Sequence, residues 1–250
     1  MAIELWLEVQ IRLNMNINKN LNLSLLREKF AKDKIIEIND FLEEEDAELI
    51  HRFLFTDIPE DWWHTSILIN RGQNLKAGHF RRFPENQKEI EEKSLLAADS
   101  FASGTFSYVF DRTIDNHFEQ CPCVECNFRA FLNTEPLLTT MSTVSAYEIT
   151  KPNEIFASRY TSGHFLSPHH DKSKGKIGFV YNLSKNWLPE HGANLHFMED
   201  DYLTVKKVIV PKFNNFILFD IPSYNGIPHF VSHVAPRINN KRISIAGWFD

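Results

Sequence analysis

The chain of 250 residues lacks an apolar run of the ~18 residues that a membrane-spanning helix needs. It also lacks a basic excess, because its formal net charge is −6, and this argues against a general nucleic-acid-binding surface. The first residues show no basic stretch followed by an uninterrupted apolar core, so no secretory signal peptide is expected. Cysteine is scarce, and an odd count of 3 fits a reducing compartment. We therefore expect a cytoplasmic protein that binds neither nucleic acid nor membranes.

The 43% hydrophobic content suffices for one globular domain with a sizeable core. Capping residues, proline placement and apolar spacing predict helices early in the chain, and short apolar runs predict strands from Ile155 onward. The early elements are helices over 24–30, over 41–55 with Asp40 as cap, over 86–110 and after Thr134, and a strand over 35–38. This order predicts helices that buttress a barrel. We expect one domain over 1–250, with a support region over 1–150 and a β core over 151–250.

The most informative pattern is His169-His170-Asp171, with His229 following 58 residues after the aspartate. Side chains alternate between the two faces of a strand, so His169 and Asp171 are expected on one side and His170 on the other. His229 is far enough along the chain to come from a different strand. Two imidazoles and one carboxylate that converge form the facial triad that holds Fe(II) and leaves positions open for substrate and oxygen. We expect His169, Asp171 and His229 to be the metal ligands.

The segment 242–249 begins thirteen residues after His229 and alternates between two faces. One face carries Arg242, Ser244, Ala246 and Trp248, and the other carries Ile243, Ile245 and Phe249. An arginine that points into a barrel costs on the order of several kcal/mol unless it meets an anion. A small dicarboxylate pairs with a guanidinium through two hydrogen bonds, and Ser244 adds a hydroxyl donor. Beside an iron site, this pattern predicts a site for 2-oxoglutarate.

Residues 155–250 carry a series of motifs that resembles the Fe(II)- and 2-oxoglutarate-dependent dioxygenases, in particular their prolyl 4-hydroxylase-like branch. The motifs are residues 159–166, the His-x-Asp pattern, residues 181–187, residues 192–195, and the phrases that begin at His229 and Arg242. Residues 1–150 resemble the N-terminal support region of that family more loosely. The resemblance implies a double-stranded β-helix, a jelly-roll or cupin-like barrel that is mostly β and is buttressed by flanking N-terminal α-helices.

The resemblance implies an enzyme that hydroxylates a C–H bond of a prolyl residue in a protein or peptide, with Fe(II) and O2 as cofactors. The cosubstrate 2-oxoglutarate is decarboxylated to succinate and CO2, and ascorbate is a candidate reductant. The alternative is the same chemistry on a free amino acid or another small metabolite, because substrate loops outside the barrel decide the choice. A catalytically silent barrel that serves as a binding module is a third hypothesis, which the complete set of site residues disfavours.

The resemblance also assigns Tyr160, on the strand before the triad, to the pocket. Many relatives place a tyrosine at the position of Asn182, where it bonds the far carboxylate of 2-oxoglutarate. Asn182 donates through its amide but reaches less far, so either Tyr160 compensates or a water molecule intervenes. Cosubstrate binding is therefore expected at Arg242, Ser244, Tyr160 and Asn182, with the role of Asn182 open. Trp248 is expected to be a packing residue.

His233 competes with His229 for the second imidazole ligand, since both share a strand face with Val231. Pro236 tends to end a central strand, so a ligand at His233 would have little strand after it. Strand length therefore favours His229.

A second candidate metal site consists of His117, Cys121, Cys123 and Cys126. Three thiolates and an imidazole satisfy structural zinc. The spacing is irregular, with Cys-x-Cys where Cys-x-x-Cys is usual. We therefore expect a loop of reduced thiols, although the sequence alone leaves metal binding open.

Overall fold

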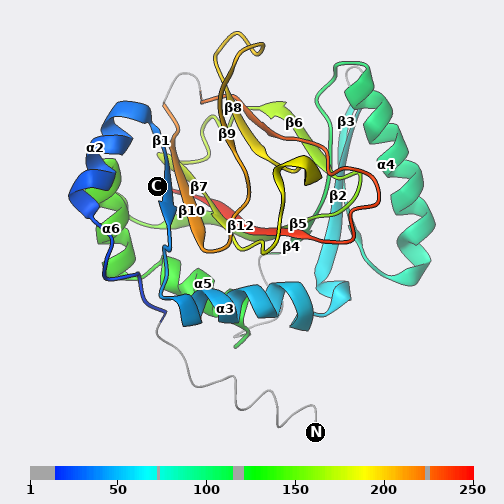
Figure 1. Cartoon of the computed structure of the whole chain (residues 1–250). Helices are drawn as coiled ribbons and strands as arrows, with labels where there is room; N and C mark the ends of the chain where they lie inside the picture. The colour runs from blue at the N-terminus through cyan, green and yellow to red at the C-terminus, as the bar shows by residue number, and fades with distance from the viewer. Residues whose placement is uncertain (1–14, 72–73, 115–120, 223–225) are drawn as a thin grey trace, which may run out of the picture.

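The computed structural model of the chain describes residues 15–71, 74–114, 121–222 and 226–250 (Figure 1). Its strands are β1 (Ile35–Asn39), β2 (Trp63–Arg71), β3 (Asn74–Arg81), β4 (Tyr108–Thr113), β5 (Pro152–Tyr160), β6 (Phe165–His169), β7 (Ile177–Asn182), β8 (Leu195–Met198), β9 (Val205–Ile209), β10 (Asn215–Asp220), β11 (His229–Val231) and β12 (Arg242–Phe249). Its helices are α2 (Leu23–Asp33), α3 (Glu44–Arg52), α4 (Gln87–Ala102), α5 (Val124–Leu132) and α6 (Glu135–Ser145). A π-helical turn covers Phe53–Asp57, and short 3₁₀ turns cover Glu60–Trp62, Pro84–Asn86 and Pro189–His191.

The strands pair antiparallel in the order β1-β10-β7-β12-β5-β4-β6-β11-β8-β9, and the β2–β3 hairpin is attached to β4. Strand β4 joins the two halves of this path, because it pairs with both β5 and β6. The path curls so that strands from its two halves face each other (Figure 1). This mostly antiparallel architecture with several helices confirms the expected double-stranded β-helix.

The sequence of strand β10 is an almost continuous apolar run, and its packing explains why. Phe216 and Leu218 pack into the layer of helices α2, α3, α5 and α6, whereas Ile217 and Phe219 point into the barrel. All six residues of β10 are buried because both faces of the strand are covered. Helix α4 lies apart from the other helices, alongside β2 and β3 (Figure 1), and its Ile90 packs on the barrel wall.

Two of the expected helix boundaries are wrong. The helix expected over 41–55 begins only at Glu44, and Asp40 instead adopts a left-handed φ of 51°. The backbone N–H groups of Phe41 and Leu42 donate to Asn214, which ties this segment to the barrel. A tertiary contact thus replaces the first helical turn.

The helix expected over 86–110 divides into α4, which ends at Ala102, and strand β4, which begins at Tyr108. The expected elements at α2, β1 and α6 are confirmed, whereas the hairpin β2–β3 and helix α5 were not predicted. Strands β1 to β4 come from the support region and join the sheet directly. Among the described helices, none is long and apolar enough to cross a membrane.

Candidate metal centre and ligand cavity

Strands β6 and β11 are neighbours in the sheet, and their register sets His169 opposite His229. Asp171 follows β6 by two residues. Its Oδ1 lies 3.6 Å from Nε2 of His169, and its Oδ2 lies 3.5 Å from Nε2 of His229. The ligand atoms of all three residues lie within 4.8 Å of one another. The structure therefore brings the three residues of the expected triad together.

Both imidazoles are oriented by backbone carbonyl groups. His169 Nδ1 lies 3.0 Å from the carbonyl oxygen of Ser167, and His229 Nδ1 lies 2.9 Å from that of Ile227. A carbonyl oxygen only accepts, so each Nδ1 carries a proton, and in the neutral form of each ring Nε2 presents a lone pair toward Asp171. Burial, followed by the nearby His229, lowers the pKa of His169 to about 4. The ring is therefore neutral at pH 7, which is the form that binds a metal.

Trp248 has a role beyond the packing that the sequence predicted. Its indole Nε1 donates to Oδ2 of Asp171 over 2.9 Å. The alternation pattern placed Trp248 on the correct face of β12, but it gave no partner for the indole. A donor of this kind fixes a ligating carboxylate and is typical of the groups that support a metal site.

Arg242 begins β12 and is only 2% exposed. Its guanidinium carbon lies 4.8 Å from the ring centre of Tyr160, and its Nη2 donates to Oδ1 of Asn182 over 3.3 Å. Within the described residues, its Nε has no hydrogen-bond partner. Burial lowers the pKa of Arg242 from its usual value, which reflects the cost of keeping the charge out of water.

Arg159, a second deeply buried arginine, has the carboxylate partners that Arg242 lacks among the described residues. Arg159 donates to Asp111 over 2.9 Å and makes two contacts of 2.7 Å with Glu60, so its charge is compensated. No carboxylate within the described residues forms an ion pair with Arg242. A buried charge without a counterion is costly, so the observed geometry fits an anion that the protein binds.

The triad and Arg242 line one cavity of about 240 Å³. Its apolar wall includes Phe156, Leu195, Phe219 and Val231. The remaining lining includes Arg112, Glu154 and Lys174. The Glu154 carboxylate accepts hydrogen bonds from both basic side chains, over 3.4 Å from Arg112 and 2.8 Å from Lys174. A small anion that entered this cavity would meet the guanidinium and the triad together.

The other expected cosubstrate residues occupy different places around Arg242. Tyr160 and Ser244 line the cavity, and the Ser244 hydroxyl lies 2.8 Å from that of Ser158. Asn182 is not among the lining residues, and its Oδ1 holds Arg242 while its Nδ2 has no partner within the described residues. Of Tyr160 and Asn182, therefore, it is Tyr160, whose pKa burial raises to about 12, that lines the cavity.

His233 lies away from the triad. Its ring stacks on Phe165 at 4.2 Å and meets Phe101 edge-on at 4.5 Å. The structure thus brings His229 to Asp171, and His233 packs beside α4. Strand β11 is only three residues long, shorter than the strand-length reasoning assumed.

Of the second candidate metal site, His117 lies outside the described residues. The sulfur atoms of Cys121, Cys123 and Cys126 lie within 4.8 Å of one another. The side-chain hydrogen bond with the Cys126 thiol, followed by burial, raises the pKa of Cys123, so without a cation this thiol is neutral.

The fold and the site together define a class of protein. Residues 155–250 match the family model of the 2OG-Fe(II) oxygenase superfamily. This part of the chain contains the triad, Arg242 and the strands that carry them, so the residues that match the family model are those that form the site, as the motifs indicated. No curated protein sequence matches the chain.

Solved structures share the fold at low identity. A Pseudomonas putida prolyl-4-hydroxylase is 16% identical with a TM-score of 0.52, over 91% of this chain and 98% of its own. A Trichoplax adhaerens prolyl hydroxylase was solved with a peptide fragment of the hypoxia inducible factor oxygen degradation domain. It is 15% identical with a TM-score of 0.52, over 98% of this chain and 92% of its own. A Burkholderia pseudomallei oxidoreductase of the 2OG-Fe(II) oxygenase family is 10% identical with a TM-score of 0.55, over 94% of this chain and 92% of its own. The fold is therefore prolyl 4-hydroxylase-like.

Proposed function

We propose that the protein is an Fe(II)- and 2-oxoglutarate-dependent dioxygenase that hydroxylates a prolyl residue in a protein or peptide. The observation that carries this proposal is the buried Arg242, which has no carboxylate partner among the described residues and lines the cavity that also contains His169, Asp171 and His229. A metal centre and an anion site in one small cavity match a metal-bound dicarboxylate. The superfamily match supports the same chemistry.

The reaction consumes the C–H substrate, O2 and 2-oxoglutarate, and it yields the alcohol, succinate and CO2. His169, Asp171 and His229 would hold Fe(II) in the facial arrangement that leaves positions for other ligands. Iron with 2-oxoglutarate and O2 supplies the oxidising power that inserts one oxygen atom into the C–H bond. The protein supplies the positions of the reactants and the exclusion of water.

Each of the surrounding residues has a task in this scheme. Arg242 binds the far carboxylate of 2-oxoglutarate, and its Nε, which has no partner in the described part of the chain, is a donor available for that contact. Asn182 accepts from Arg242 and so positions the guanidinium. Trp248 holds the Asp171 carboxylate. The apolar wall keeps water from the reactive centre, which strengthens the electrostatic contacts inside.

A prolyl substrate agrees with the apolar side chains that line the cavity beside the triad. Phe106, Tyr108 and Leu166 lie there, and Phe106 is 5.8 Å from the ring of His169. An apolar ring such as pyrrolidine suits these contacts better than a charged metabolite does. The alternative of a free amino acid is favoured by the charged lining residues Arg112 and Glu154, which suit an ionic substrate.

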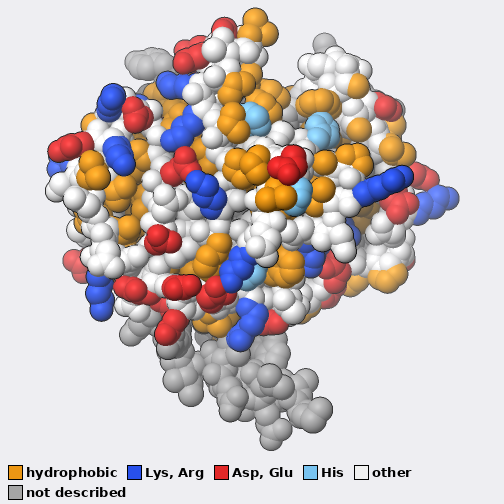
Figure 2. Space-filling view, viewed as in Figure 1, with side chains coloured by type: hydrophobic (Ala, Val, Ile, Leu, Met, Phe, Trp, Pro, Cys, Tyr) orange, Lys and Arg blue, Asp and Glu red, His pale blue; other side chains and the backbone are white. Residues whose placement is uncertain are grey.

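A protein or peptide substrate is supported by exposed apolar side chains on the hairpin of β8 and β9, which is next to β11 in the sheet. Strand β8 pairs with β11, which carries His229, and the hairpin formed by β8 and β9 extends from there. Tyr202, Leu203 and Val205 are 42%, 86% and 46% exposed on this hairpin. Figure 2 shows apolar side chains at its tip, at the top of the molecule. Such side chains offer contacts to a polypeptide. A cytoplasmic location, with ascorbate as reductant, completes the proposal.

The test measures succinate formation with Fe(II), 2-oxoglutarate and O2, followed by mass spectrometry of peptide and metabolite pools. We expect succinate to form even without substrate, and we expect a product heavier by one oxygen atom in the peptide pool. A product only among free amino acids or other metabolites would transfer the activity to the alternative substrate class. A folded, iron-loaded protein that forms no succinate would contradict the dioxygenase proposal.

A further inference from the structure

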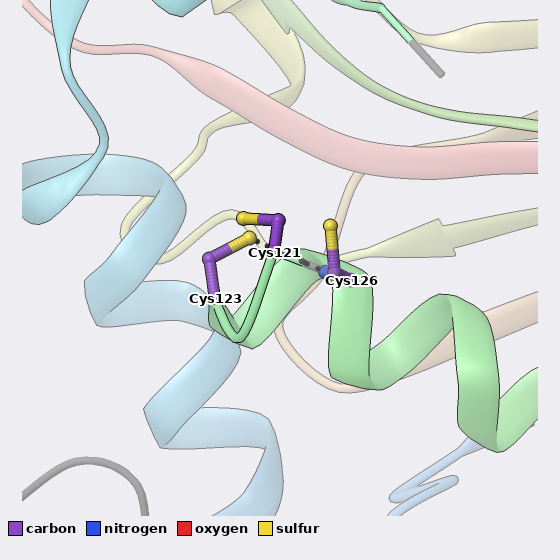
Figure 3. A group of neighbouring side chains, drawn as sticks. All are labelled: Cys121, Cys123 and Cys126. Atoms are coloured by element: carbon purple, nitrogen blue, oxygen red, sulfur yellow. Dashed lines mark hydrogen bonds between the residues drawn. The ribbon is translucent and has the colours of Figure 1, made fainter. Parts of the chain in front are cut away.

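All three cysteines of the chain lie together at the start of helix α5. Cys123 is the N-cap residue of α5, Cys126 lies in its first turn, and Cys121 precedes the helix by three residues. Figure 3 shows that the sulfurs of Cys121 and Cys123 face each other. Cys121 and Cys123 are 9% and 4% exposed. The cluster lies outside the cavity that holds the triad and is not explained by the proposed chemistry.

We propose that Cys121, Cys123 and Cys126 form a binding site for a soft, thiophilic metal ion such as Zn²⁺, and that this site anchors helix α5. Thiolate sulfur selects zinc and other soft ions over the hard ions that prefer oxygen ligands. The three sulfurs would occupy three corners of a tetrahedron, and water would complete the coordination.

The distances are compatible with this assignment. A zinc–sulfur bond of about 2.3 Å places the sulfurs of a tetrahedral site about 3.8 Å apart. The observed sulfur atoms lie within 4.8 Å of one another, so each pair has to approach by about 1 Å at most. Side-chain rotation accomplishes a movement of this size without a change in the backbone.

The helix terminus provides a second, independent observation. The backbone N–H of Cys126 donates to the sulfur of Cys123 over 3.4 Å (Figure 3). The electropositive N-terminus of a helix favours a thiolate, and this backbone contact lowers the pKa of Cys123, although the Cys126 thiol and burial outweigh it until a cation binds. A thiol that only fills space needs neither this contact nor two sulfur neighbours.

A metal at this position would stabilise the base of the barrel. Helix α5 is tied to β4 through Glu125, which accepts from Thr113 over 2.6 Å. Phe128 of α5 stacks on Tyr181 of β7 with ring centres 5.4 Å apart. Strand β7 pairs in turn with β12, which carries Arg242. The site is therefore a structural one that supports the sheet behind the cavity.

The experiment uses the full-length reduced protein and Co²⁺ as a spectroscopic probe. Thiolate-to-cobalt charge-transfer absorption can arise only from this cluster, because the chain has no other cysteine. We expect a single Co²⁺ ion per chain to produce this absorption. It should persist in Asp171→Ala, which disables the proposed iron site, and disappear in Cys123→Ser. The readout is thus independent of the dioxygenase proposal.

A second measurement needs no variant, and it decides the question if Cys123→Ser fails to fold. Zn²⁺ should slow the alkylation of all three thiols in the wild-type protein and raise its melting temperature. Absence of the charge-transfer absorption in folded, reduced wild-type protein would overturn the proposal. So would alkylation rates that Zn²⁺ does not change, since the cluster would then be a group of packed thiols only.

Discussion

The hydrogen bond from Trp248 to Asp171 gives a prediction about a residue that is not itself a metal ligand. In Trp248→Phe the indole N–H is lost while an aromatic ring still fills the same position beside Phe156. Oδ2 of Asp171 then loses its donor at 2.9 Å, and the carboxylate gains freedom to rotate away from His229. A hydrogen bond to a charged group contributes about 1.5–3 kcal/mol.

This free energy corresponds to a loss of about 10- to 150-fold in Fe(II) affinity if the whole contribution is expressed in metal binding. Groups that support metal ligands typically account for about 10- to 100-fold, so the two estimates agree. The assay is a Fe(II) titration under anaerobic conditions, with circular dichroism as a check of folding. We expect the variant to bind iron about 10- to 100-fold more weakly than the wild type.

Trp187→Phe is the matched control. Trp187 is also buried and also donates its indole N–H, but to the carbonyl oxygen of Gly192 over 2.8 Å, away from the triad. The same chemical change there should leave Fe(II) affinity unaltered. Equal iron affinity in the folded Trp248→Phe protein and the wild type would refute the role given to Trp248, and an equal loss in both variants would show a general effect on stability.

The remaining predictions concern the histidines. His229→Ala should abolish Fe(II)-dependent succinate formation, whereas His233→Ala should retain most of it, because His233 stacks on Phe165 and does not contact Asp171; the reverse result would show that the wrong imidazole was assigned. The metal-free protein should lose stability as the pH falls from 7 to 5. Burial holds the pKa of His169 near 4, so the unfolded chain binds a proton in this range that the folded chain does not. With an unfolded pKa near 6.5, this histidine alone accounts for up to about 2 kcal/mol between pH 6.5 and pH 5, measured by urea unfolding. The non-titrating His169→Asn should reduce the slope of stability against pH without abolishing it, because burial also lowers the pKa of other histidines such as His164. An identical slope in both proteins would contradict the assignment.

Much of the candidate site could be predicted from the sequence, because strand periodicity carries the information. His169 and Asp171 come together as the alternation predicted. Arg242, Ser244, Ala246 and Trp248 line the cavity, and Ile243, Ile245 and Phe249 pack in the core behind it. The register between β6 and β11 could not be predicted, since it depends on pairing between segments far apart in the chain.

The features that the sequence did not reveal are tertiary contacts. The partner of the Trp248 indole depends on how the residues after β6 approach β12. The delayed start of α3 depends on Asn214, which follows Phe41 by more than 170 residues and binds its N–H and that of its neighbour. The convergence of three sulfurs from an irregular Cys-x-Cys-x-x-Cys spacing depends on the helix that begins between them. Local propensity contains none of this information.

The central claim is that Arg242 and the triad form one site for a metal-bound dicarboxylate. The most direct test is the affinity of 2-oxoglutarate for Fe(II)-loaded Arg242→Ala under anaerobic conditions. Removing one partner of a buried charge pair costs about 2–5 kcal/mol, which predicts binding about 30- to several-thousand-fold weaker. Arg242→Lys should restore only part of this loss, because an ammonium group cannot make the forked contact.

The matched control is Arg112→Ala. Arg112 lines the same cavity, but it already forms an ion pair with Glu154. The account predicts a large loss of 2-oxoglutarate affinity in Arg242→Ala, a change of about threefold or less in Arg112→Ala, and nearly unchanged Fe(II) affinity in both. An unchanged 2-oxoglutarate affinity in folded Arg242→Ala, or a large loss only in Arg112→Ala, would contradict it.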